Sequence, residues 1–231
     1  MAMCSFAIQK PISGSSGTFT GGLVKIIHHT TEGSKAADAF TAFAAHKSDP
    51  HFTVDATNIY QHIDTDVASR ALKHPPGTPQ TNRDSAIQIE LVGFAGAAKN
   101  ARSLANLARL CRWIEKEHAV SRTWASGAPK PAQNGKDPGG HKRDQPTWES
   151  KSGHYGHSQV PNNVHWDPAY SALEAAYVLA AEFDAAGHLT NPDHPAVRAL
   201  AERPLPATTF EPAMIKDHDA DAGEPENGDG E

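Results

Sequence analysis

The sequence has little cysteine and no long apolar run, and each shortage excludes a class of protein. Its 231 residues include two cysteines, Cys4 and Cys111, far apart in the chain. Such spacing is neither a CxxC metal or redox motif nor a disulfide scaffold, so we expect two free thiols. No stretch approaches the roughly 20 apolar residues of a membrane span, and the amino terminus lacks the basic and then apolar pattern of a classical export signal. We therefore expect a chain that is made in the cytoplasm and does not span a membrane.

The sequence also lacks an excess of basic charge. Its net charge is −6, and the last 16 residues, 216–231, contain seven acids and one base. The rest of the chain therefore has 20 acids and 20 bases. A protein that binds nucleic acid usually carries clustered Lys and Arg, so the balanced body argues against nucleic acid as a partner.

Apolar periodicity and turn residues predict an alternation of strands and helices. We expect strands at 23–27, 51–54, 59–63 and 86–92, with the second and third forming a hairpin, and helices at 34–46, 98–118 and 169–186. Ser34 is the expected N-cap of the first helix, and 121–150 is expected to be a long surface loop. This order predicts a single α/β domain in which helices flank a central mixed β-sheet.

Composition divides the chain into three regions. Residues 1–21 form a Gly/Ser-rich lead, 22–190 the folded domain, and 191–231 a Pro-rich and then acidic tail. The tail is too poor in apolar residues to form a core, so we expect it to be disordered.

The strand at 86–92 has the clearest alternation. Ile87, Ile89 and Leu91 fall on one face, and Gln88 and Glu90 on the other. An acid on the polar face of such a strand is usually solvated, and it can also reach into a site.

Histidines suggest a metal site. The sequence contains 14 of them, and three fall within residues 153–168, a segment rich in Gly, Pro and Asn that also holds Asp167. A catalytic zinc needs three protein ligands and one open position. His28, at the end of the first predicted strand, could join a His and Asp167 of this segment to supply such a set.

Four motifs in order resemble those of the zinc-dependent N-acetylmuramoyl-L-alanine amidases, a family that includes phage lysozyme-type amidases and the peptidoglycan recognition proteins. The motifs are Val-Lys-Ile-Ile-His-His-Thr at 24–30, His-Phe-Thr-Val-Asp at 51–55, Ala-Ile-Gln-Ile-Glu-Leu-Val-Gly at 86–93, and Gly-His at 156–157 with Asp-Pro at 167–168. The resemblance covers about residues 22–187 and implies the amidase fold and a Zn²⁺ cofactor.

The resemblance also implies roles for individual residues. His28, His157 and Asp167 would bind the zinc, and Glu90 would orient or deprotonate the water that the zinc activates. His165 occupies the place of a Lys that stabilises the oxyanion in several members, and it could instead hold Asp167. His29 is the rival of His28, because successive strand residues face opposite sides and only one of the two can face the site.

Two departures from the family pattern restrict what the resemblance implies. Some members have a catalytic Tyr before the His-Phe of the hairpin, where this chain has Pro50. The His-Ala motif that follows the hairpin in the family is replaced by Ala-Ser-Arg-Ala-Leu at 68–72. The catalytic roles that those members assign to this Tyr therefore cannot be assigned to residues of this chain.

The expected function is hydrolysis of the amide bond between N-acetylmuramic acid and L-alanine in peptidoglycan or muropeptides. The alternatives are a non-catalytic peptidoglycan-binding module of the same fold and a zinc peptidase or amidohydrolase with a substrate outside the wall. We expect a monomer that acts on the cell wall, after phage release as an antimicrobial endolysin or after delivery by a secretion system. A cytosolic enzyme that recycles muropeptides is the third alternative.

Overall fold

The computed structural model describes residues 2–204, so the disorder expected for residues 205–231 of the tail lies outside the described residues, whereas residues 191–204, for which disorder was also expected, include a helix. The strands are β1 (Ile8–Gln9), β2 (Gly17–Thr18), β3 (Lys25–Thr30), β4 (Phe52–Val54), β5 (Ile59–Gln61), β6 (Val67–Ala68), β7 (Ala86–Leu91) and β8 (Gly153–Gly156). The helices are α1 (Ala36–His46), α2 (Ala101–His118), α3 (Gln145–Ser150), α4 (Ala172–Ala180) and α5 (Pro195–Ala201), with a short 3₁₀ turn, η1 (His157–Gln159).

Six of the strands form one mixed sheet, in the order β1-β5-β4-β7-β3-β8. The β4–β5 hairpin is antiparallel, and the other neighbouring strands run parallel. β2 and β6 form a separate antiparallel pair. The register of β3 on β7 places His29 opposite Glu90. The predicted single α/β domain with a mixed sheet is confirmed.

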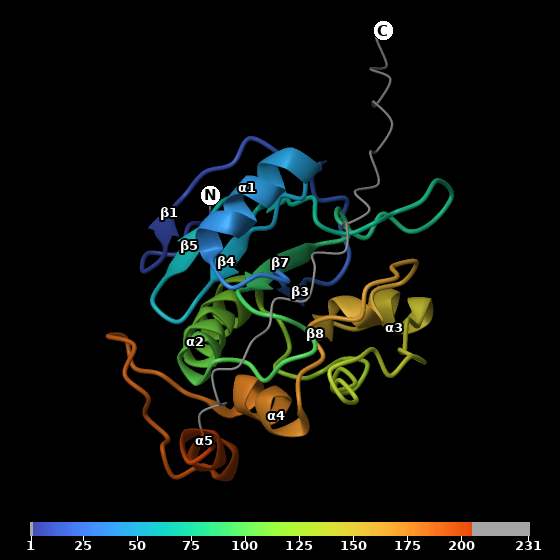
Figure 1. The fold of residues 1–231 in the computed structure, drawn as a ribbon. Coiled ribbons are helices and arrows are strands. Elements are labelled where there is room, and N and C mark those ends of the chain that lie inside the picture. The colour runs from blue at the N-terminus through green and yellow to red at the C-terminus, as the bar shows by residue number, and fades with distance from the viewer. Residues whose placement is uncertain (1, 205–231) are drawn as a thin grey trace, which may run out of the picture.

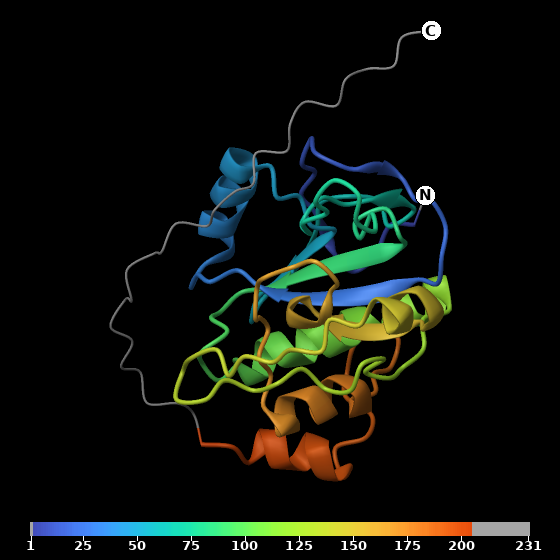
Figure 2. The ribbon, with the colours of Figure 1, turned by 90° about the vertical axis from the view of Figure 1, so that its right-hand side faces the viewer.

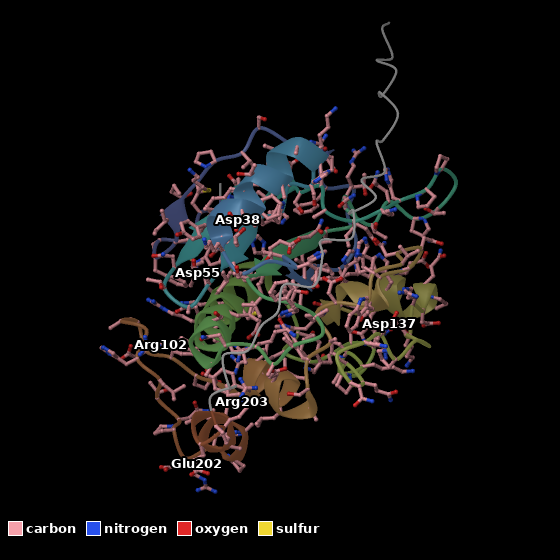
Figure 3. All side chains as sticks on the ribbon, in the orientation of Figure 1. Asp38, Asp55, Arg102, Asp137, Glu202 and Arg203 are labelled. Carbon is pink, nitrogen blue, oxygen red and sulfur yellow. The ribbon has the colours of Figure 1, made fainter. Side chains whose placement is uncertain are left out.

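Helices cover the two faces of the sheet unequally (Figures 1 and 2). Figure 2 shows α1 on one side of the sheet and α2 on the other, with α4 and α5 in successive layers beyond α2. Charged residues such as Asp38 on α1 and Glu202 after α5 lie on these outer layers and are exposed (Figure 3). Among the described residues, no helix is long and apolar enough to cross a membrane.

The main core lies between the sheet and α2. Asn100 caps α2 by accepting hydrogen bonds from the backbone N–H groups of Arg102 and Ser103, which would otherwise lack partners. The helix buries Leu104, Leu107, Ala108, Cys111 and Ile114, which recur at helical spacing. The odd-numbered residues of β7 pack in the same core, which confirms the predicted alternation.

The structure differs from the sequence prediction at several element ends. β3 continues to Thr30, and α1 begins without a side-chain cap from Ser34. α3 lies at the end of the predicted 121–150 loop, and β8 lies in the Gly-, Pro- and Asn-rich segment 153–168, for which no strand was predicted. The terminal regions also take part in the fold, because β1 pairs with β5 and α5 buries Val197 and Leu200 in the main core.

Candidate metal centre

A buried cluster of polar side chains lies at the carboxyl ends of β3 and β7, on the face of the sheet away from α2. His29 comes from the end of β3, Glu90 from the end of β7, His157 from η1, and Asp167 from the loop before α4. All four are less than 8% exposed. Parallel strands bring their carboxyl ends to one edge, and that topology brings residues far apart in sequence together.

A chain of amides fixes the protonated nitrogen of His29. The Asn82 side-chain oxygen accepts from the backbone N–H groups of Ala71 and Leu72, so it is the oxygen that meets the Gln88 NH₂ at 2.9 Å. Gln88 therefore presents its oxygen to Nε2 of His29, 3.1 Å away, and Nε2 is the donor. Burial lowers the pKa of His29 to about 3, so the ring is neutral near pH 7 and its Nδ1 carries a lone pair.

An amide also fixes which ring nitrogen of His157 carries the proton. The Asn163 side-chain oxygen accepts from the backbone N–H of Lys73 at 3.0 Å, which fixes the orientation of its amide. This oxygen also lies 3.0 Å from Nε2 of His157, so a neutral His157 donates from Nε2. Nδ1 of His157 is then an acceptor, and it lies 3.0 Å from Nδ1 of His29.

Asp167 brings a third acceptor to these two nitrogens. Its Oδ1 lies 3.2 Å from Nδ1 of His157, and its Oδ2 lies 3.8 Å from Nδ1 of His29 and accepts from the backbone N–H of Thr30. Burial opposes ionisation of Asp167, but a proton on His157, and then on His29 or His165, outweighs it and keeps the pKa of Asp167 below its usual range. Without a proton on either Nδ1, the carboxylate faces two imidazole lone pairs, an arrangement that a cation would satisfy.

The donor set fits a divalent cation. His29, His157 and Asp167 offer ligand atoms that all lie within 4.8 Å of one another. Two imidazole lone pairs and a carboxylate cannot hydrogen-bond to one another, whereas two His and one Asp form a usual three-ligand set for catalytic zinc. The amides on both Nε2 atoms are the outer partners that orient metal-binding histidines.

The expectation that His28 shares this site is corrected by the structure. His28 faces α2, where its Nε2 lies 2.9 Å from Nδ1 of His154. His29, the rival residue, is the one that meets His157 and Asp167. The reason is the register, because residues opposite each other on paired strands share a face and His29 is paired with Glu90.

Glu90 is placed as the sequence predicted, on the face of Gln88 and beside the cluster. Its Oε1 lies 3.9 Å from Nδ1 of His29, and its buried Oε2 has no hydrogen-bond partner. Burial raises the pKa of Glu90 well above its usual value, and the negative charges of Asp167 and Glu32 raise it further. A carboxyl group held in this way binds a proton more readily than one in water, as a proton acceptor in a reaction must.

His165 and Glu32 border the cluster. The His165 ring stacks on the His157 ring, with centroids 4.7 Å apart and planes 19° from parallel. Glu32 accepts from the Thr30 hydroxyl at 2.6 Å and from the backbone N–H of Ala95 at 2.8 Å. Glu32 therefore joins the loops that follow β3 and β7 at the edge of the site.

Fold and site together define an α/β protein with a buried His-His-Asp centre and an adjacent acid. Residues 24–170 match the family model described as N-acetylmuramoyl-L-alanine amidase. Because this match spans more than half of the chain, the protein belongs to the N-acetylmuramoyl-L-alanine amidase family. No curated protein matches the sequence.

One solved structure with a TM-score above 0.5 shares the fold, and two others are similar at lower scores. The chain is similar to a Staphylococcus aureus hydrolase, AmiA, solved in complex with its ligand, with a TM-score of 0.53 and 16% identity over 78% of this chain and 82% of that one. It is also similar to the amidase LysC from Clostridium intestinale URNW, with a TM-score of 0.47 and 11% identity over 73% and 93%. A mutant endolysin from Bacillus subtilis gives a TM-score of 0.39 and 27% identity over 53% and 80%.

The sequence analysis missed the residues that support the cluster. Gln88 was placed on the polar face of its strand without a role, and Asn82, Asn163 and Thr30 were not singled out. Their amide and backbone contacts span up to 137 residues of sequence. No local sequence signal marks contacts of that range.

Proposed function

We propose that this protein is a zinc-dependent peptidoglycan hydrolase that cleaves the amide bond between N-acetylmuramic acid and L-alanine of the stem peptide. The observation that carries the proposal is the convergence of three acceptors from His29, His157 and Asp167, in a chain that belongs to the amidase family. Endolysin and amidase neighbours support action on the cell wall.

The three ligand residues would hold the zinc, with Gln88 and Asn163 fixing the two rings. A zinc ion in such a set polarises a carbonyl oxygen and lowers the pKa of a water molecule to about 7. Thr30 keeps Asp167 in place through its backbone N–H. The chain thus supplies a rigid, mostly buried ligand set, which favours electrostatic stabilisation of a developing charge.

Glu90 is the proposed general base. Its partnerless Oε2 and its raised pKa suit an acid that accepts a proton from water and later delivers it to the leaving amine. His165 is the proposed donor to the developing oxyanion. Its ring lies against His157 and is partly exposed, so a substrate carbonyl can approach it.

The experiment is digestion of purified peptidoglycan, followed by mass spectrometry of the soluble products. Protein stripped with a chelator, the same protein with zinc restored, and the Glu90→Gln variant are compared. The proposal predicts stem peptides with a free L-alanine amino terminus and intact glycan, released only by the zinc-restored wild type.

Two outcomes would contradict the proposal. Sedimentation of the zinc-loaded protein with peptidoglycan without any release would identify a wall-binding module. Cleavage within peptides, with the lactyl amide left intact, would identify a peptidase.

A further inference from the structure

A second buried cluster lies directly behind the metal centre, on the α2 face of the sheet. Nε2 of His28 lies 2.9 Å from Nδ1 of His154, whose Nε2 lies 3.0 Å from a Glu115 oxygen. The Tyr170 hydroxyl lies 3.3 Å from Nδ1 of His28. Tyr170 and both histidines are fully buried, and Glu115 is 8% exposed.

All the hydrogen bonds in this cluster point the same way, from Tyr170 toward Glu115. Glu115, which is paired with Arg112 and Arg122, is a carboxylate that only accepts, so Nε2 of His154 donates to it. Nδ1 of His154 is then an acceptor, which makes Nε2 of His28 its donor. Nδ1 of His28 in turn accepts from the Tyr170 hydroxyl.

Three of the four members of this chain lie close in sequence to a proposed zinc ligand. His28 directly precedes His29, His154 is three residues before His157, and Tyr170 is three residues after Asp167. These short tethers connect the chain to all three ligand-bearing segments. Glu115 anchors the chain to α2, the longest described helix.

We propose that the hydrogen-bond chain Tyr170–His28–His154–Glu115 is a positioning network that sets the relative positions of the three zinc-binding segments from behind the sheet. The proposal rests on the function proposed above. None of the four residues belongs to the proposed ligand set. Their role is to hold β3, β8 and the segment after Asp167 in one geometry, on which the ligand spacing depends.

A second metal site is the rival explanation, because the Cys111 thiol lies with His28 and His154 in a group of three potential ligands. The two clusters differ in their donors. At the metal centre, acceptors face one another. In the second cluster, every imidazole donor faces an acceptor and every imidazole acceptor faces a donor, so no cation is needed to satisfy these nitrogens.

The test replaces Tyr170 by Phe, which removes one hydroxyl and keeps the ring. Nδ1 of His28 then loses its donor, so the chain ends at His28 and its connection to the segment after Asp167 is lost. The matched control is Tyr155→Phe. Tyr155 is also fully buried, but its hydroxyl donates to the Lys151 backbone oxygen on the other side of β8.

Zinc affinity is measured by competition with a chelator, together with kcat, KM and the melting temperature of the metal-free protein. We expect both variants to lower the melting temperature, and Tyr170→Phe alone to weaken zinc binding by about tenfold and to lower kcat with little change in KM. His154→Gln, which can still accept from His28 and donate to Glu115, should retain more zinc affinity than His154→Ala.

Equal zinc affinity in Tyr170→Phe and Tyr155→Phe would overturn the positioning network. So would zinc that remains in His157→Ala and is lost when Cys111→Ser is added, because that result would identify a second metal site. A wild type that binds no zinc and releases no product would instead refute the proposed function, so the two failures are distinguishable.

Discussion

Nδ1 of His29 and Nδ1 of His157 lie 3.0 Å apart, and the amides behind both rings make both nitrogens acceptors. On the other face of the same strands, the nitrogens of His28 and His154 lie at almost the same distance, 2.9 Å, as a donor and an acceptor. The distance alone therefore does not distinguish a metal site from a hydrogen bond. The direction of the hydrogen bonds around each pair does.

Glu90→Gln tests the general base. Gln keeps the size of Glu90 and removes the group that accepts a proton, so turnover should fall by about 10²–10⁴-fold while zinc content stays unchanged. Peptidoglycan digestion and elemental analysis measure the two quantities, with Glu117→Gln on the exposed face of α2 as the control. Loss of zinc would show that Glu90 holds the site together. Near-normal turnover would move the base elsewhere, with His165 the first candidate.

His51 should make the metal-free protein sensitive to acid. Burial lowers the pKa of His51 from 6.5 to about 4, while its Nε2 donates to the Val67 backbone oxygen. Since the unfolded chain binds the proton more tightly, this contribution to stability is complete above pH 6.5 and is lost as the pH falls through 6.5 toward 4. Between pH 7 and pH 5 the loss amounts to roughly 2 kcal/mol of the free energy of unfolding.

Urea unfolding of the metal-free protein at both pH values measures this effect. His51→Gln should reduce the pH-dependent loss of free energy by about that amount, whatever its effect at pH 7. His46→Gln, at the exposed end of α1, should leave the loss unchanged. An identical pH dependence in His51→Gln would show that His51 is not held neutral by the fold.

Leu200→Ala tests whether α5 belongs to the domain. Leu200 is 3% exposed and packs in the main core, so its truncation should cost about 2–5 kcal/mol of the free energy of unfolding. Leu189→Ala is the control, because Leu189 is 36% exposed and should cost less than about 0.5 kcal/mol. Equal, small effects of the two substitutions would show that α5 docks only weakly.

The β7 strand shows what the sequence could predict. Its alternation placed Glu90 and Gln88 on one face because a side-chain period of two is a local property of the strand. The α2 helix could equally be predicted from the sequence, since its buried residues recur at helical spacing within one segment.

The histidine pair shows what the sequence could not predict. Alternation establishes that His28 and His29 face opposite sides, but both faces of β3 are buried, so burial does not identify which of the two histidines meets His157 and Asp167. The answer depends on the register with β7, which pairs residues 61 positions apart. α5 was missed for a similar reason, because two apolar residues in a Pro-rich segment form a core contact only once α4 provides the partner.

The most direct test of the central claim is the zinc content of two purified variants, measured by elemental analysis beside the wild type. The account predicts about one zinc per chain in the wild type, loss of most of it in His29→Ala, and retention in His28→Gln under zinc-saturating conditions. Gln at position 28 can keep both a donor and an acceptor, so the comparison isolates the ligand from its neighbour. Zinc retained in His29→Ala and lost in His28→Gln would contradict the account and make His28 the ligand.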